Sequence, residues 1–268
     1  MGEPVDVRPG RPQPVFNVPA GSVPAHPAGP LIVRVNDPSD IPGIDRTAID
    51  RVIWFEAPLR LAEASWPPGA PLDIIVEDPA REAAGLYGLV QFRREHDVRV
   101  TIPGRPGIAR CARIAMALQL PVRLVTLQPS PAVVAELDEV LDVYLREASA
   151  PVEFLQAALA WWLHGDAPPI WVALELDPDW FPRMDPGGAP AGAPSPPCER
   201  DFVARRLAQL VASGAECATC RFQGWCQGFF KWPDPAYDCA GVTRVLARVE
   251  EAAAQVGRDM DEARSLAP

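Results

Sequence analysis

The chain has 268 residues, of which 48% are hydrophobic and 22% are charged, and its formal net charge at pH 7 is −10. This size suits one large domain or a domain and a half, with enough apolar side chains for a substantial core. The negative charge argues against a nucleic-acid binder, because phosphate contacts need clustered lysine and arginine, and Lys231 is the only lysine.

The first thirty residues are rich in proline and contain no continuous apolar stretch. Proline fixes φ and lacks an amide donor, so residues 1–30 are predicted to be a disordered or extended tail. They do not have the pattern of a signal peptide or a membrane span, and the cytoplasm is the expected location. In that reducing compartment the six cysteines are expected to be thiols or metal ligands.

Short apolar or β-branched runs follow the tail, each bounded by Pro, Asp or Gly, and they are predicted to be strands. These runs cover residues 31–35, 52–55, 72–76, 98–102 and 122–127. Amphipathic stretches that predict helices lie between or after the later runs, at residues 81–96, 108–118 and 131–146. The last of these has the clearest apolar face, and Ser130 and Pro131 suit its start.

Strands that alternate with helices of this length indicate βαβ units and a parallel sheet. The chain has about five or six such units, fewer than the eight of a complete barrel. We therefore predict an α/β fold whose first domain, residues 31–182, is a partial or reduced (β/α) barrel. A doubly wound open sheet is the alternative that the sequence leaves open.

The second half of the chain predicts more helix. Residues 152–163 predict an apolar helix, and residues 170–176 predict the last strand. The Gly- and Pro-rich residues 183–197 are typical of a linker. Beyond the linker, helical periodicity on both sides of a cysteine-rich segment predicts a small C-terminal domain over residues 198–268.

Four of the six cysteines, Cys217, Cys220, Cys226 and Cys239, lie in that segment. A C-x-x-C pair lets two thiolates reach one metal centre from a single turn, and loops can return the other two. Structural zinc prefers two tight pairs that face each other, whereas here only the first pair is tight. The wider spacing of the others favours an iron–sulfur cluster; zinc is the alternative metal, and four buried free thiols are the alternative without one.

Glycines and aromatic residues surround these cysteines. Glycine lets backbone amides approach a cluster, and aromatic side chains keep water away from it. The residues in question are Gly224, Trp225, Gly228, Phe229, Phe230 and Trp232.

The spacing C-x2-C-x5-C with a later cysteine resembles the SPASM domain, an extension that carries auxiliary clusters on many radical S-adenosylmethionine enzymes that modify peptides. The resemblance implies that Cys217, Cys220, Cys226 and Cys239 hold one fully ligated 4Fe–4S cluster. It also implies that the upstream α/β segment is a barrel of the radical S-adenosylmethionine type. Residues 152–181 are similar to the segment that joins that barrel to the SPASM domain.

The chain departs from this family at the motif that defines it. The C-x3-C-x2-C loop expected after the first strand is absent, because residues 36–40 and those that follow contain no cysteine. The shared ligand of the family's other auxiliary cluster would fall at Phe230, and only Cys198 remains nearby as a stray candidate. The resemblance therefore implies a non-catalytic or accessory protein. It would transfer electrons, bind the precursor peptide or pair with an active radical enzyme in peptide natural-product maturation.

Two other functions stay open. A zinc-stabilised scaffold or binding protein would use the α/β domain for an interaction and the cysteines for folding. An enzyme of another kind would place its site at the carboxyl ends of the strands, with Asn36, Glu56, Glu77 and Asp78 as candidates.

The remaining candidate residues are given structural interpretations. Cys111 is expected to be a buried small hydrophobic residue within a helix, and Cys198 a free thiol at the end of the linker. The acidic residues Asp177, Asp179 and Asp185 are expected in a solvated turn. No catalytic role is assigned to the three histidines, His26, His96 and His164.

Overall fold

A computed structural model describes residues 16–20, 23, 31–35, 49–54, 71–147, 150–165, 169–173 and 200–266. Six parallel strands form one sheet within these residues, in chain order across the sheet. They are β1 (Phe16–Pro19), β2 (Leu31–Val35), β3 (Ile49–Trp54), β4 (Leu72–Ile75), β5 (Val98–Pro103) and β6 (Val122–Val125). A parallel bridge from Val122 to Val152 extends the pairing beyond β6.

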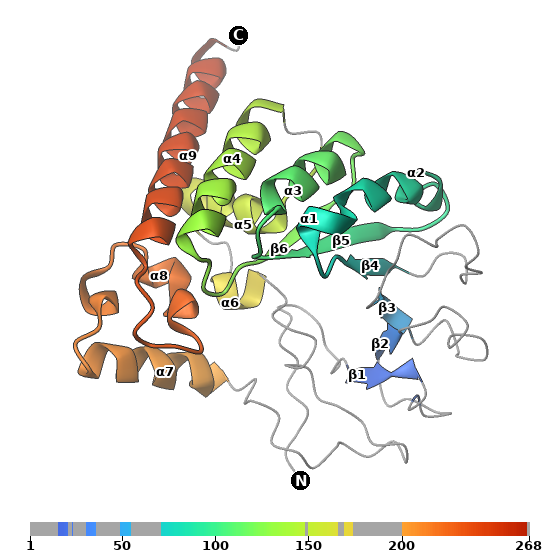
Figure 1. The fold of residues 1–268 in the computed structure, drawn as a ribbon. Helices are drawn as coiled ribbons and strands as arrows, with labels where there is room; N and C mark the ends of the chain where they lie inside the picture. The colour runs from blue at the N-terminus through green and yellow to red at the C-terminus, as the bar shows by residue number, and fades with distance from the viewer. Residues whose placement is uncertain are drawn as a thin grey trace.

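Helices lie along one side of this sheet and at the end next to β6 (Figure 1). Those connecting or following the strands are α1 (Pro79–Glu82), η5 (Ala83–Gly88), α2 (Leu89–Phe92), α3 (Ile108–Ala117), α4 (Pro131–Glu147), α5 (Glu153–His164) and α6 (Ile170–Ala173). The C-terminal ones are α7 (Arg200–Ala212), η7 (Glu216–Thr219), α8 (Gln223–Cys226), η8 (Phe229–Lys231) and α9 (Ala240–Leu266). None of the helices in these described ranges is long and apolar enough to cross a membrane.

The predicted α/β class and parallel sheet are confirmed. The five strands predicted between residues 31 and 127 are present, and the strand order never reverses across the sheet. A doubly wound sheet requires such a reversal, so that alternative does not describe the six strands. The linker at residues 183–197 lies outside the described residues.

Three local predictions need correction. Residues 16–19 form β1 and pair with β2, although residues 1–30 were expected to be a disordered or extended tail. Residues 170–173 form the single helical turn α6 instead of a strand; a short apolar run does not distinguish the two states, and Ile170 and Trp171 are buried in the core next to α5. The helix expected at residues 81–96 is broken into α1, η5 and α2, where Gly85 and Gly88 lower the helix propensity.

The two faces of the sheet differ in chemistry because side chains alternate along each strand. On the helix-covered face, apolar residues such as Ile74, Val100 and Leu124 belong to the main hydrophobic core. The opposite face carries charged and polar side chains that are also buried. Asp73 on β4 is at its centre, and it is 0% exposed.

Asp73 is held by side chains from the two next strands. Its Oδ2 lies 2.6 Å from Nη2 of Arg99 and 3.7 Å from Nη1 of Arg123, and its Oδ1 accepts a hydrogen bond of 2.6 Å from Thr101. Arg99 also donates to Glu153 at the start of α5, at 2.8 Å. Burial by itself raises the pKa of Asp73, but the two guanidinium groups hold that pKa below its ordinary value.

Replacing Asp73 with asparagine is therefore expected to lower the free energy of unfolding at pH 7 by about 2 kcal/mol, because charged hydrogen bonds are lost. A carboxylate with a lowered folded pKa stabilises the fold above its unfolded pKa, ordinarily 3.8, and this stabilisation disappears as the pH falls through the folded value. The gap between wild type and Asp73→Asn should thus shrink below about pH 4. Urea unfolding at several pH values measures it.

The control for this prediction is Asp261→Asn, which alters an exposed pair with Arg264. Its effect should stay within about 0.5 kcal/mol at every pH. A gap between wild type and Asp73→Asn that stays constant from pH 7 to pH 3 would show that the ion pairs do not set the stability of this face.

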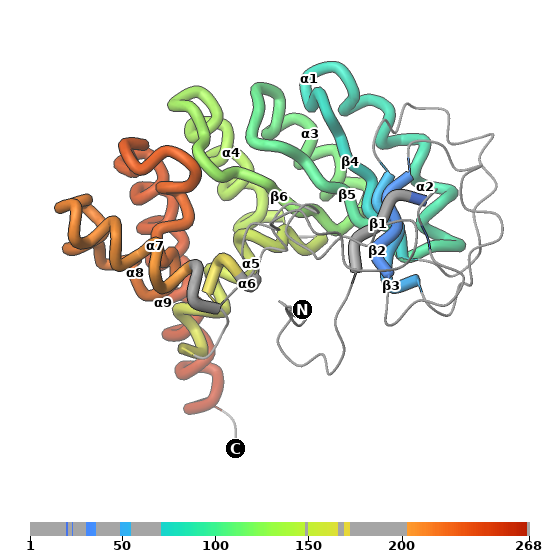
Figure 2. Tube along the Cα trace, turned by 90° about the horizontal axis from the view of Figure 1, so that it is seen from below, coloured from blue at the N-terminus to red at the C-terminus, as the bar shows by residue number. Residues whose placement is uncertain are grey.

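The C-terminal helices attach to the end of the sheet next to β6. Helix α9 packs against α4 and α5, and Arg248 on α9 forms ion pairs with Asp138 and Asp142 on α4. The apolar core is continuous from the sheet into this region. Figure 2 shows α7 to α9 at the opposite end of the molecule from β1 to β3.

The cysteine module, defined as residues 216–239, is fixed to the carboxyl end of β6. Gln128, three residues after the end of β6, donates from Nε2 to the backbone oxygens of Phe230 and Asp234, at 3.2 and 2.7 Å. The Tyr237 hydroxyl donates to the backbone oxygen of Pro129 at 2.7 Å. In parallel sheets this edge is where ligands and active sites gather.

Candidate metal centre

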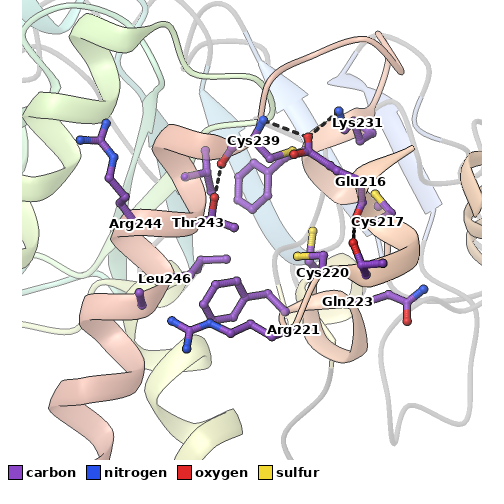
Figure 3. A pocket seen from close by; sticks show the side chains of 17 residues that line it. Glu216, Cys217, Cys220, Arg221, Gln223, Lys231, Cys239, Thr243, Arg244 and Leu246 are labelled. Carbon is purple, nitrogen blue, oxygen red and sulfur yellow. Dashed lines mark hydrogen bonds and ion pairs between the residues drawn. The ribbon is translucent and has the colours of Figure 1, made fainter. Parts of the chain in front are cut away.

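All four cysteines of the predicted site line one cavity of about 450 Å³ in the cysteine module. They come from two short helices and the residues next to helix ends: Cys217 lies in η7, Cys220 directly after it, Cys226 at the end of α8, and Cys239 immediately before α9. Figure 3 shows Cys217, Cys220 and Cys239 around this space. The structure thus brings together the four residues that the sequence predicts as ligands.

The chain reverses direction directly after Cys226. Gln227 and Gly228 both have left-handed backbones, with φ of 47° and 78°, and such a φ is easiest for glycine. A Cβ at position 228 would lie 2.7 Å from Cδ1 of Leu210 on α7. The turn directs the backbone amides of Gly228, Phe229 and Phe230 toward the Cys226 sulfur, where they stabilise its thiolate.

The thiols lie close enough to affect one another electrostatically. Cys217 interacts with each of the other three, and Cys226 also interacts with Cys239. Burial raises the pKa of Cys226 to about 11 and that of Cys239 to about 12, and it also raises the pKa of Cys217. Thiols in this state must lose their protons to bind a metal, so metal binding releases protons.

An ion pair between a buried lysine and an exposed glutamate lies at the edge of the cavity. The Nζ of Lys231 is 2.7 Å from Oε1 of Glu216, and the Lys231 side chain is 7% exposed. The same Glu216 oxygen accepts a hydrogen bond of 3.2 Å from the backbone amide of Cys239, and Lys231 also donates to the backbone oxygen of Tyr237. These contacts join the segment that carries Cys217 to the segment that carries Cys239 (Figure 3).

Lys231 and Glu216 each stabilise the charged form of the other. The hydrogen bond from Lys231 holds the pKa of Glu216 below its ordinary value. Burial by itself lowers the pKa of Lys231, but Glu216 and the nearby thiols hold it above the ordinary value. Lys231 is therefore a buried cation beside Cys217 and Cys239.

Buried aromatic side chains lie in and behind the wall of the cavity. Phe222 and Phe230 line the cavity and are both buried. Trp225 is 0% exposed, and its ring centroid lies 5.9 Å from Phe154 and 5.6 Å from Trp162, both on α5. This packing fixes the cysteine module on α5.

The arrangement fits a cluster bound by four thiolates. All four cysteines line one space, backbone amides approach the sulfur of Cys226, and the lining away from the cysteines includes apolar Val242 and Leu246 from α9. Within the described part of the chain, no three His, Cys, Asp or Glu side chains form a group that could hold a metal ion. The five described cysteines are all free thiols and form no disulfide.

The other sequence candidates lie elsewhere. Cys111 is 0% exposed inside α3, as predicted, and burial raises the pKa of its thiol to about 12. The Asp78 side chain caps α1 by accepting from the Arg81 amide at 3.3 Å, so this candidate has a structural role. Asn36, Glu56 and Cys198 lie outside the described residues.

The sequence analysis missed Lys231 and Glu216 as parts of the site. A signal for Lys231 was present, because it is the chain's single lysine and sits five residues after Cys226. Glu216 directly precedes Cys217, but nothing in the sequence pairs it with Lys231.

Comparison of the chain with family models, with curated proteins and with solved structures finds no match.

Proposed function

We propose that this chain holds one 4Fe–4S cluster in the cavity through Cys217, Cys220, Cys226 and Cys239, and serves as the non-catalytic partner of a radical S-adenosylmethionine enzyme that modifies peptides. The observation that carries the proposal is that all four cysteines line one cavity. Full ligation by protein thiolates leaves no iron open to a substrate.

A cluster accounts for the cysteine spacing better than a zinc ion does. Structural zinc prefers two tight pairs that face each other, whereas here only Cys217 and Cys220 form such a pair. A polynuclear cluster needs its thiolates further apart. The amides directed at Cys226 and the aromatic inner wall are the features that tune such clusters.

Such a cluster supplies one-electron chemistry when bound. The residues of this chain hold it at the carboxyl edge of the sheet, through the hydrogen bonds from Gln128 and Tyr237 that fix the cysteine module next to β6. Phe222 and Phe230, which line the cavity and are buried, exclude water from its inner side. The outer side faces the opening between the cysteine module and α9, from which electrons can be exchanged with a partner protein.

The strand order supports the barrel part of this proposal. Six parallel strands in chain order, with a further parallel bridge at Val152, are the topology of a partial (β/α) barrel. Such a sheet, followed by the cysteine module, has the layout of a radical S-adenosylmethionine enzyme with a SPASM domain. Because the sequence lacks the C-x3-C-x2-C motif, we assign the chain an accessory role. In this proposal it acts in the cytoplasm, and its partners are an active enzyme, a precursor peptide or both.

A purification from the native host tests this role. The tagged chain is isolated without oxygen, and both the complex and the chain alone are incubated with S-adenosylmethionine and dithionite. We expect 5′-deoxyadenosine from the complex, which should contain a second iron–sulfur protein, and none from the chain alone. Cleavage of S-adenosylmethionine by the isolated chain would overturn the accessory role, and so would a complex that contains no enzyme able to cleave it.

A further inference from the structure

The chain contains a single lysine, Lys231, which lies in the cysteine module. Every other one of the 25 basic residues is arginine, so the composition of the chain strongly favours arginine for a cation. Lys231 nevertheless has a compact ammonium group, 7% exposed, in the wall of the cavity. A guanidinium group is larger and planar, and at this position it would have to fit between Glu216 and the Tyr237 backbone oxygen.

Lys231 lies beside two of the ligands. It lines the same cavity as Cys217 and Cys239, and it donates to the backbone oxygen of Tyr237, two residues before Cys239. Its ion pair with Glu216 is 2.7 Å long, and that carboxylate also accepts from the Cys239 amide. Lys231 and Glu216 thus place one positive and one negative charge at the same edge of the cavity.

A 4Fe–4S core with four thiolates carries a net negative charge that increases on reduction, and nearby charge is one of the factors that set its potential. We propose that Lys231 is a positioning residue that raises the reduction potential of the centre held by the four cysteines, and that Glu216 both orients Lys231 and opposes its effect. This inference rests on the proposed function, because it requires the cluster to be present.

The two charges predict shifts of opposite sign. In Lys231→Met, loss of the cation should favour the oxidised centre by about tenfold, a shift of about −59 mV for one electron. In Glu216→Gln, the cation is no longer opposed, so the potential should rise. The glutamine oxygen can still accept from the Cys239 amide, which keeps this contact between the two cysteine segments.

The test is an anaerobic titration of the reconstituted full chain with dithionite as the electron donor, followed by visible absorbance. Lys231→Arg retains the charge, and its potential should lie closer to that of wild type than the potential of Lys231→Met does. The matched control is Arg221→Met, because Arg221 also lines the cavity but is 62% exposed and pairs with Glu250. Solvent screens such an exposed charge, so this variant should shift the potential much less.

The iron content of each variant shows whether the proposed function fails or only the role of Lys231. If wild type binds no iron–sulfur cluster, the proposed function fails. If all variants retain the wild-type iron content and their potentials coincide, or if both substitutions move the potential in the same direction, the cluster stands and the role of Lys231 is refuted. If Lys231→Met loses its iron, the decision rests on Glu216→Gln, for which a potential equal to or below that of wild type would refute the role.

Discussion

Replacing any one of Cys217, Cys220, Cys226 and Cys239 with alanine is expected to lower bound iron from about four to below about two atoms per chain. The cavity offers four thiols to one cluster, and the loss of one leaves an iron without its protein ligand. The largest loss is expected for Cys226→Ala, because three backbone amides are oriented toward its sulfur. Iron and acid-labile sulfide are measured on protein reconstituted without oxygen.

Cys111→Ala is the matched control, since it removes a fully buried thiol from α3, outside the cavity. It should retain the iron content of wild type. Equal iron content in all five variants would contradict the assignment of the cavity, as would an equal loss in Cys111→Ala.

Trp225→Ala is expected to lower the free energy of unfolding by about 3–5 kcal/mol, the usual cost of removing a large buried aromatic side chain. Trp225 is fully buried and contacts Phe154 and Trp162. It therefore contributes both to the core and to the attachment of the cysteine module to α5. Urea unfolding followed by far-ultraviolet circular dichroism measures the loss, because this signal does not depend on tryptophan fluorescence.

Tyr87→Ala provides the comparison, because Tyr87 is 61% exposed. Its effect should remain within about 0.5 kcal/mol. A loss below about 1 kcal/mol for Trp225→Ala would mean that the cysteine module does not depend on this contact for its place in the fold.

The strands could be predicted because their apolar runs are short and bounded by Pro, Asp or Gly, as at residues 98–103. Strand β1 was missed because Pro14 and Pro19 frame it within a proline-rich segment, and a proline density of that kind predicts disorder. Pairing with β2 is a tertiary effect, and no local pattern at residues 16–19 reveals it. The turn at residues 170–173 was misassigned because a run of apolar residues fits both a strand and a buried helix.

The candidate site was easier to predict than its surroundings. Cysteine spacing is a local property, and it picked out four cysteines that the structure places along one cavity. The ion pair between Glu216 and Lys231 depends on how η7 and η8 fold back on each other. Likewise, the ion pairs of Asp73 with Arg99 and Arg123 depend on strand register, which the sequence alone does not give.

Elemental analysis of the native protein, purified without oxygen, tests the central claim most directly. We expect about four iron atoms and about four acid-labile sulfides per chain, broad visible absorbance and little zinc. One tightly held zinc ion with no iron or sulfide would contradict the cluster, and the cavity would then belong to a zinc-stabilised scaffold protein.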